Sequence, residues 1–262
     1  MHNFRDEVVW ITGSSSGIGA ALARDFAERG AIVCLSARRA DKLEALANEL
    51  GARGLRASVY PCDVTSEEDL EKTVAAIIGD HGQLDCAIAN AGFGVSGRIE
   101  SLTGEEWRRQ LDVNVVGSAL TAKYALPELR KSRGRLALVG SVMAMLSTPK
   151  SGAYAASKFA VRAIGQTLSM ELHGSGVSCT TIHPGFVESD IARVDNSGTY
   201  LESRKDKRPA KLMWPTDKAA KVMVGAIARR KREFVFTGHG KVAGYLGRHF
   251  PGFVHFAQTR KS

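Results

Sequence analysis

Apolar residues fall into two kinds of segment that alternate along the chain. Short β-branched runs at 7–12, 31–37, 55–61, 84–90, 134–141, 177–184 and 233–238 predict buried strands. Amphipathic stretches at 17–29, 41–50, 66–79, 103–131, 153–173 and 216–230 predict the helices between them. Apolar strands separated by helices form a parallel sheet that is covered on both faces, so the sequence predicts a doubly wound α/β fold with seven strands. Ligands of such sheets bind in the loops beyond the carboxyl ends of the strands.

Length and composition favour one globular unit. A chain of 262 residues, 44% of them hydrophobic, can bury a single large core, so we expect one domain over 1–262. Without an apolar run long enough to span a bilayer, or an apolar leader near the start, we expect a cytoplasmic protein. Cys34, Cys62, Cys86 and Cys179 lie in or beside predicted strands and lack C-x-x-C spacing, so we interpret them as small buried side chains and predict no metal site.

Positive charge is concentrated in the last quarter of the chain. The whole sequence carries +9, whereas residues 193–262 have 16 Lys and Arg against 5 Asp and Glu. Such a segment can contact nucleic acid, an anionic membrane or an acidic partner protein, or it can be a solvated face, which we favour. We expect no nucleic-acid binding, because neither a reading helix nor an aromatic platform accompanies the charge.

A glycine-rich turn directly follows the first predicted strand. The segment "TGSSSGIG" begins at residue 12 and places Gly13, Gly17 and Gly19 at the opening of a helix. Glycines let a pyrophosphate approach the backbone closely, and the free amides of a helix N-terminus hold it. Tight turns also use glycine without a ligand, and G-x-x-x-G-x-G differs from the usual dinucleotide spacing. The position between strand and helix favours a dinucleotide site.

The end of the second strand indicates which nucleotide binds. NAD sites usually carry an acidic residue there to accept hydrogen bonds from the adenosine ribose. This chain has "SARRAD" instead, with Arg38 and Arg39 where a guanidinium can grip a 2′-phosphate. We therefore predict NADP, the alternative being surface arginines ahead of a helix.

A tyrosine and a lysine lie one helical turn apart in "SGAYAASKFAV". Tyr154 and Lys158 share a helix face, so the phenol and the ammonium can enter the same space. A free tyrosine titrates near about 10, and a neighbouring cation is expected to lower that pKa and suit the phenol to proton transfer. Exposed helices also carry such pairs without any function.

Six motifs in order resemble the short-chain dehydrogenase/reductase family over nearly the whole chain. They are "TGSSSGIG" at 12, "ANAG" at 89, Asn114 in "LDVNVVG", Ser141, "YAASK" at 154 and "HPGFV" at 183. The resemblance implies a Rossmann fold with sheet order 3-2-1-4-5-6-7 and an NAD(P)-dependent site that interconverts carbonyls and alcohols. It also implies a homodimer or homotetramer.

The resemblance further implies a role for each matching side chain. Ser141 would donate a hydrogen bond to the substrate oxygen, and Tyr154 would give or take its proton. Lys158 would lower the pKa of Tyr154 and hold the nicotinamide ribose, and Asn114 would position a water that connects the lysine to solvent. The expected cofactor contacts are Gly13, Ser15, Ser16, Gly17, Ile18, Gly19, Arg38, Arg39, Asp63, Val64, Asn90, Ala91, Gly92, Tyr154, Lys158, Pro184, Gly185, Val187 and Ser189. The chain departs from the family in "ANAG" for the commoner "NNAG" and in Ser189 for threonine.

Side chains near the predicted chemistry suggest an apolar ketone or secondary alcohol. The walls are expected to include Met143, Met145, Leu146, Phe186 and Val187. The long polar segment 190–214 is expected to form a lid over the substrate.

The C-terminal extension, residues 238–262, interleaves Tyr245, Phe250, Phe253 and Phe256 with cations. We favour packing on a neighbouring subunit or on the pocket over contact with a membrane surface.

Three functions follow from these features. We favour an NADP-dependent oxidoreductase of a lipophilic carbonyl or alcohol compound. The alternative is a β-ketoacyl carrier-protein reductase, whose acidic partner would match the basic last quarter. A non-catalytic dinucleotide-binding regulator ranks below both, because it would not need Asn114, Ser141, Tyr154 and Lys158 together.

Overall fold

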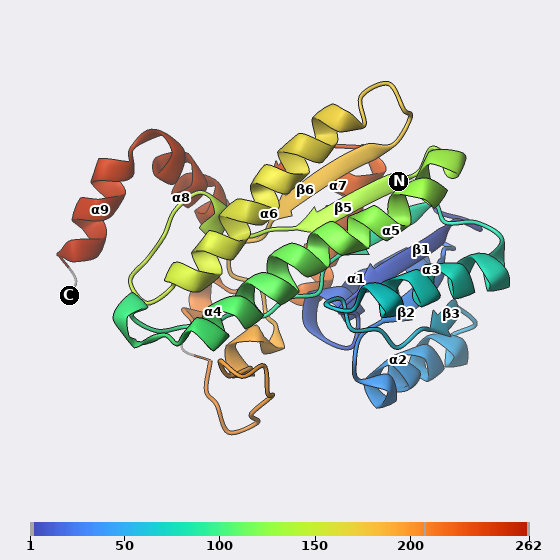
Figure 1. Ribbon diagram of the computed structural model, residues 1–262, viewed down its shortest axis with the longest axis horizontal. Coiled ribbons are helices and arrows are strands. Elements are labelled where there is room, and N and C mark those ends of the chain that lie inside the picture. Colours follow the sequence, from blue (N-terminus) through green and yellow to red (C-terminus); the bar gives the residue numbers. More distant parts are fainter. Residues whose placement is uncertain (1–2, 207, 261–262) are drawn as a thin grey trace.

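Seven parallel strands form one sheet in the computed structural model, which describes residues 3–206 and 208–260. The order β3-β2-β1-β4-β5-β6-β7 confirms the expected topology (Figure 1). The strands are β1 (Val8–Thr12), β2 (Ile32–Ser36), β3 (Arg56–Val59), β4 (Cys86–Ala89), β5 (Arg135–Val139), β6 (Ser178–His183) and β7 (Glu233–Val235). Each is shorter than predicted, because the flanking residues turn away toward the helices.

Helices cover both faces of the sheet (Figure 1). They are α1 (Gly17–Glu28), α2 (Ala40–Ala52), α3 (Glu67–His81), α4 (Gly104–Leu111), α5 (Gly117–Ser132), α6 (Gly152–Glu171), α7 (Thr216–Ala228), α8 (Gly238–His249) and α9 (Pro251–Thr259). Successive strand residues point to opposite faces, so Val9 and Ile11 of β1 pack under α1, α2 and α7. Val8 and Trp10 pack under α3, α5 and α6. All five residues of β1 are therefore buried, as a strand between two helical layers requires.

The helix predicted over 103–131 is interrupted in the structure. It begins with a capping box between Thr103 and Glu106 and runs as α4 to Leu111. A π-helical turn, Asp112–Val116, then precedes α5. Such turns occur often at functional sites, and this one contains the fully buried Asn114.

The two segments expected to lie outside the regular fold differ from each other. In the described residues of this segment, 190–206 and 208–214, the helical elements are the short 3₁₀ turns Asp190–Arg193 and Ala210–Leu212, and Val194 forms an isolated antiparallel bridge with Tyr200. The C-terminal extension is helical instead, and α9 lies beyond the outer end of α8, away from the sheet (Figure 1). Among the described residues, no helix combines the length and apolar character needed to cross a membrane.

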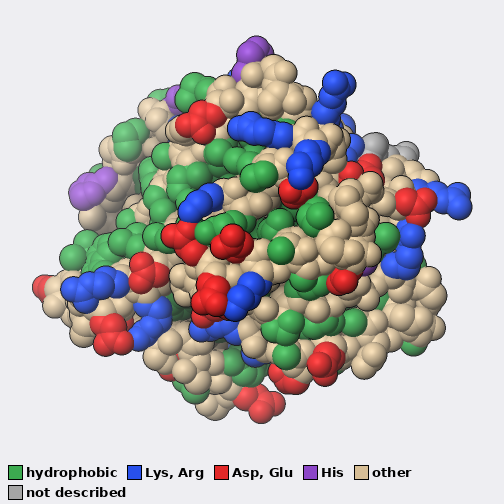
Figure 2. Space-filling model, turned by 45° about the vertical axis from the view of Figure 1, so that its right-hand side comes forward, with side chains coloured by type: hydrophobic (Ala, Val, Ile, Leu, Met, Phe, Trp, Pro, Cys, Tyr) green, Lys and Arg blue, Asp and Glu red, His purple; other side chains and the backbone are tan. Residues whose placement is uncertain are grey.

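The four cysteines are buried and unpaired, which confirms their interpretation as small packing residues. Burial raises the pKa of the Cys62 thiol to about 11 and that of Cys179 to about 12, so both stay protonated at neutral pH. On the face shown in Figure 2, acidic and basic side chains are interspersed instead of forming a patch of one sign.

Candidate active site

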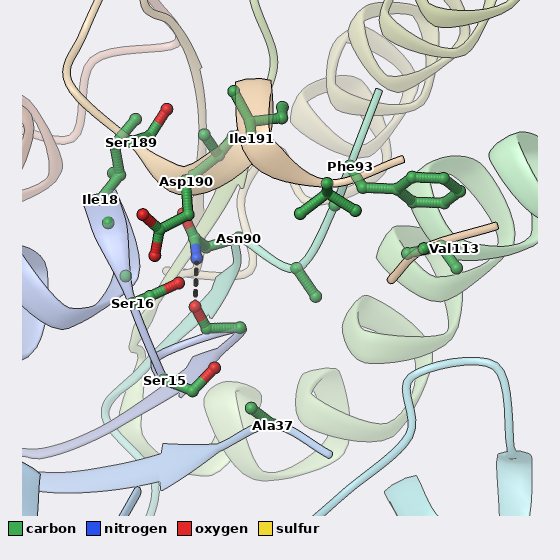
Figure 3. Close-up of a pocket in the computed structure, with 18 of the residues that line it drawn as sticks. Ser15, Ser16, Ile18, Ala37, Asn90, Phe93, Val113, Ser189, Asp190 and Ile191 are labelled. Carbon is green, nitrogen blue, oxygen red and sulfur yellow. Dashed lines mark hydrogen bonds between the residues drawn. The ribbon is translucent and has the colours of Figure 1, made fainter. Parts of the chain in front are cut away.

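A cleft at the carboxyl ends of the strands brings the predicted cofactor residues together. All nineteen line it, from Gly13 in the glycine turn to Ser189 after β6. Ser15, Ser16 and Ile18 of the glycine turn lie on the same side as Ser189 and Asp190, and Phe93 and Val113 lie across from them (Figure 3). Ser141, Tyr154 and Lys158 line the same cleft, and Asn114 is buried behind it.

The glycine turn has the geometry of a close-approach site. Gly13 and Gly17 adopt positive φ values of 67° and 54°, which L side chains rarely reach. A Cβ on Gly19 would lie 2.3 Å from the Gly13 carbonyl oxygen. Asn90 Nδ2 donates to the carbonyls of Thr12 at 3.0 Å and Gly13 at 3.1 Å, so β4 holds the turn in place (Figure 3). Bare backbone at a helix N-terminus fits a pyrophosphate.

Two arginines border the end of the cleft beyond β2. Arg38 and Arg39 are exposed at the start of α2. Arg39 Nη2 donates to Ser15 Oγ at 2.9 Å and to Ser16 Oγ at 3.2 Å, which holds its guanidinium over the glycine turn. Asp63, which follows the neighbouring strand β3 and also lines the cleft, accepts two hydrogen bonds from Thr65, at 3.0 and 2.8 Å.

Helix α6 carries Tyr154 and Lys158 into the cleft floor. Lys158 is 5% exposed and its Nζ donates to the Val139 carbonyl at 2.9 Å. The same Nζ lies 5.8 Å from the centre of the half-buried Tyr154 ring. Alanines and a serine separate the two residues, so α6 can press closely against β5 and keep both side chains at the strand end.

The pKa of Tyr154 departs from the sequence-based expectation. Burial raises it, while a hydrogen bond with Ser141 and the charge of Arg208 act in the opposite direction. The expected lowering by Lys158 is therefore wrong for this structure. The reason is that burial of the phenol disfavours its charged form more than the neighbouring groups favour it. Burial also lowers the pKa of Lys158, to about 8.

Asn114 anchors the loop after β4 through its carboxamide. Its Oδ1 accepts from the Phe93 N–H, and its Nδ2 donates to the Phe93 carbonyl and to Ser157 Oγ, each at 3.0 Å. A Cβ on Gly92 would lie 3.0 Å from Asn114 Oδ1 and 3.7 Å from Lys158 Nζ. The glycine thus leaves space between the amide and the ammonium.

The substrate end of the cleft is lined differently from the prediction. Of the five expected wall residues, only Val187 borders it. Met145 packs beneath α8, where a Cβ on Gly244 would lie 2.7 Å from its sulfur. Phe186 stacks on His239 with ring centres 5.3 Å apart. Helix α8 therefore covers the segments that the sequence places at the substrate.

Other side chains take their place, and sequence reasoning missed them. Phe93, Val113, Ile191, Val194 and Tyr200 supply apolar surface, and Arg109 and Arg208 add cations. Arg208 donates to the carbonyls of Val187 and Ser189, each at 3.0 Å, so it ties the two ends of the 190–208 segment together. The only signal in the sequence is the basic stretch "SRKDKR", which does not indicate where Arg208 points.

Comparison with known proteins agrees with this geometry. Residues 7–199 match the family model of the short chain dehydrogenases. An uncharacterized oxidoreductase of Staphylococcus aureus (strain MRSA252) is 38% identical over 192 residues, 73% of this chain and 82% of the relative. Another, from Myxococcus xanthus (strain DK1622), is 31% identical over 252 residues, 96% of this chain and 95% of the relative.

Two solved structures resemble the fold. An alcohol dehydrogenase from the archaeon Thermococcus sibiricus, complexed with 5-hydroxy-NADP, has a TM-score of 0.76 and 29% identity, covering 88% of this chain and 95% of its own. A short chain dehydrogenase/reductase from Burkholderia phymatum, in complex with NAD, has a TM-score of 0.85 and 25% identity, covering 94% of each chain. The chain belongs to the short-chain dehydrogenase family. It is an oxidoreductase of the NAD(P)-dependent type.

Proposed function

We propose that the protein is an NADP-dependent oxidoreductase that interconverts a carbonyl and a secondary alcohol on a lipophilic small molecule. The observation that supports this most directly is the meeting of Ser141, Tyr154 and Lys158 in the cleft of the glycine turn. Bound there, the nicotinamide supplies or accepts the hydride. The chain's own residues orient the substrate and move the proton.

Each side chain then has a task. Ser141 donates to the substrate oxygen and stabilises the charge that develops on it. Tyr154 transfers the proton, and its raised pKa keeps the phenol protonated at neutral pH, as carbonyl reduction requires. Lys158, whose pKa lies at about 8, can both hold the ribose hydroxyls and exchange a proton near physiological pH. Asn114 holds the loop that borders this proton path.

The preference for NADP is supported by charge at the end of β2. Arg38 and Arg39 line the cleft, and neither position offers an acid to a ribose. Arg39 is already oriented by Ser15 and Ser16, so little side-chain entropy remains to be lost when it binds a phosphate. The nineteen residues named above are the proposed cofactor contacts.

A lipophilic substrate is supported by the walls that the structure supplies. Phe93, Val113, Ile191 and Val194 offer apolar surface beside the reacting groups. Ile191, Val194, Tyr200 and Arg208 all come from the segment 190–214, whose described residues are proposed as the lid. The basic last quarter also fits an acidic carrier protein, so a β-ketoacyl carrier-protein reductase is the second candidate.

We also propose that the protein is a homodimer or homotetramer. Four aromatic side chains on α8, on α9 and at the junction between them, Tyr245, Phe250, Phe253 and Phe256, are between 50% and 59% exposed. Clustered exposed aromatic side chains are typical of an interaction surface. A second copy of the chain is the proposed cover. Phe253→Ser with Phe256→Ser should lower the mass measured by light scattering. If the double variant keeps the wild-type mass and the wild-type protein sediments with anionic liposomes, peripheral membrane contact would be favoured instead.

A panel of ketones, secondary alcohols and acetoacetyl thioesters, followed by NADPH absorbance, tests the reaction. Tyr154→Phe should lower turnover by about 10²- to 10⁴-fold with nucleotide affinity retained. Tyr245→Phe, on the exposed face of α8, is the matched control and should leave turnover unchanged. Activity on thioesters alone would select the carrier-protein reductase. Nucleotide binding without turnover of any compound would select the regulator.

A further inference from the structure

A buried histidine connects the loop of Ser141 to the last strand of the sheet. His183 ends β6 and is fully buried. Its Nδ1 lies 3.0 Å from the main-chain carbonyl oxygen of Ser141. Its Nε2 lies 3.0 Å from Glu233 Oε1 at the start of β7. The ring also packs on Gly140, where a Cβ would come within 2.6 Å of Nδ1.

The chemistry of the two partners determines what the ring does. A main-chain carbonyl only accepts hydrogen bonds, so Nδ1 donates to Ser141. Nε2 and the Glu233 carboxylate are at ion-pair distance, although the N–H does not point directly at the oxygen.

Glu233 extends the connection to the helix of Tyr154. The same Oε1 accepts from Arg162 Nε at 2.7 Å and from Arg248 Nη2 at 2.6 Å. Arg162 lies one turn beyond Lys158 on α6. A continuous polar chain therefore runs from the Ser141 carbonyl through His183, Glu233 and Arg162 to the helix that carries the proposed acid.

We propose that His183 is a positioning residue for Ser141. The serine adopts extended backbone angles, φ −165° and ψ 160°, and its Oγ accepts from the Met143 N–H at 3.1 Å. The hydrogen bond from His183 to the Ser141 carbonyl limits rotation about ψ of Ser141. It therefore keeps the Ser141 hydroxyl within reach of Tyr154. The role rests on the function proposed above.

The pKa of Tyr154 reports this alignment without requiring turnover. The hydrogen bond with Ser141 lowers that pKa against the effect of burial, and Arg208 acts in the same direction. Lys158 is the other ionisable group beside the ring. If Ser141 rotates away while both cations stay, the tyrosine should titrate at higher pH.

Three variants separate alignment from packing. His183→Leu keeps similar bulk and removes the donor to Ser141. His183→Asn restores a donor near the position of Nδ1. Ile182→Val, at the neighbouring buried position on β6, perturbs the core without altering the donor. Each is examined by ketone reduction with NADPH, by nucleotide affinity, and by NMR titration of ¹³Cζ-labelled tyrosine assigned with Tyr154→Phe.

His183→Leu should lower kcat at least tenfold with nucleotide affinity within twofold, and should move the Tyr154 titration to higher pH. His183→Asn should restore most of the wild-type kcat and most of the wild-type Tyr154 titration. Ile182→Val should change neither kcat nor the titration. If His183→Leu does not fold, Arg162→Leu replaces it, because Arg162 is less buried than His183 and contacts the same Glu233 carboxylate. This variant should lower kcat about threefold and should also move the Tyr154 titration to higher pH.

Unchanged kcat and unchanged titration in His183→Leu would overturn the positioning role. A fall in kcat in His183→Leu that His183→Asn does not reverse would also overturn the positioning role. His183 would then act through core packing alone. A wild-type enzyme that reduces no carbonyl would instead remove the proposed function, and the tyrosine titration would still test the alignment of Ser141.

Discussion

Lys158 Nζ donates to the Val139 carbonyl at 2.9 Å, which ties helix α6 to the end of β5. This single hydrogen bond accompanies nearly complete burial, and the pKa of the lysine falls from 10.5 to about 8 as a result. The folded protein therefore holds the charged form at a cost in stability.

Replacing the lysine should stabilise the protein in a pH-dependent way. Between about pH 8 and 10.5 the unfolded chain binds this proton and the folded chain does not, so wild-type stability rises with pH through that window. Lys158→Met should accordingly raise the free energy of unfolding by about 1–3 kcal/mol at pH 6.5, and less at pH 9.5. Urea denaturation at the two pH values measures this. Lys42→Met, at an exposed position on α2, is the matched control and should change the free energy of unfolding by less than about 0.5 kcal/mol. An equal gain for Lys158→Met at both pH values would contradict the pKa assigned to Lys158.

Arg39 should determine the choice between NADPH and NADH. Loss of a charge-assisted phosphate contact costs about 1.5–3 kcal/mol. Arg39→Ala should weaken NADPH binding by about 10- to 100-fold and leave NADH binding within about twofold. Fluorescence titration with both nucleotides measures the two constants. Arg98→Ala, at a side chain that is 73% exposed, is the matched control. Equal weakening of both nucleotides would point to disturbance of Ser15 and Ser16 instead.

Gly19 should tolerate no side chain. A Cβ there would lie 2.3 Å from the Gly13 carbonyl oxygen and 2.6 Å from Asn90 Nδ2, so the turn must open. Gly19→Ala should lower the free energy of unfolding by about 1–3 kcal/mol and abolish nucleotide binding. Gly51→Ala, with open space around it in α2, should stabilise by about 0.5–1 kcal/mol. Calorimetry with and without NADPH compares the stability and nucleotide binding of the two variants. Intact nucleotide binding in Gly19→Ala would argue against a close approach of the pyrophosphate to this turn.

Arg208 should hold the proposed lid in place. Its guanidinium bonds the carbonyls of Val187 and Ser189 and also pairs with Asp206. Arg208→Leu should speed chymotrypsin cleavage at Tyr200 about tenfold and weaken NADPH binding about fivefold, since local opening costs one or two such bonds. Lys211→Leu, exposed in the same segment, should do neither. Cleavage at the wild-type rate would show that other contacts hold the segment.

The Tyr154 to Lys158 pair shows how far sequence reasoning reached. Their spacing predicted a shared helix face, and the structure places both in one cleft with Ser141. The direction of the tyrosine pKa came out opposite to the prediction, because desolvation depends on residues distant in sequence that bury the ring. Asn114 was placed in a continuous helix, whereas the π-helical turn around it adapts to Phe93 and Ser157, far from it along the chain.

The sequence by itself determined the order of strands and helices, the glycine turn, and the residue types that meet at the strand ends. Local periodicity and backbone freedom are properties of short segments, so these features can be read without knowing what packs where. Only the tertiary structure decided that α8 covers Met145, that Arg208 closes the 190–208 segment, and that His183 joins Ser141 to Glu233. Those contacts bring together residues from separate elements, and their burial sets the charges and positions on which the chemistry depends.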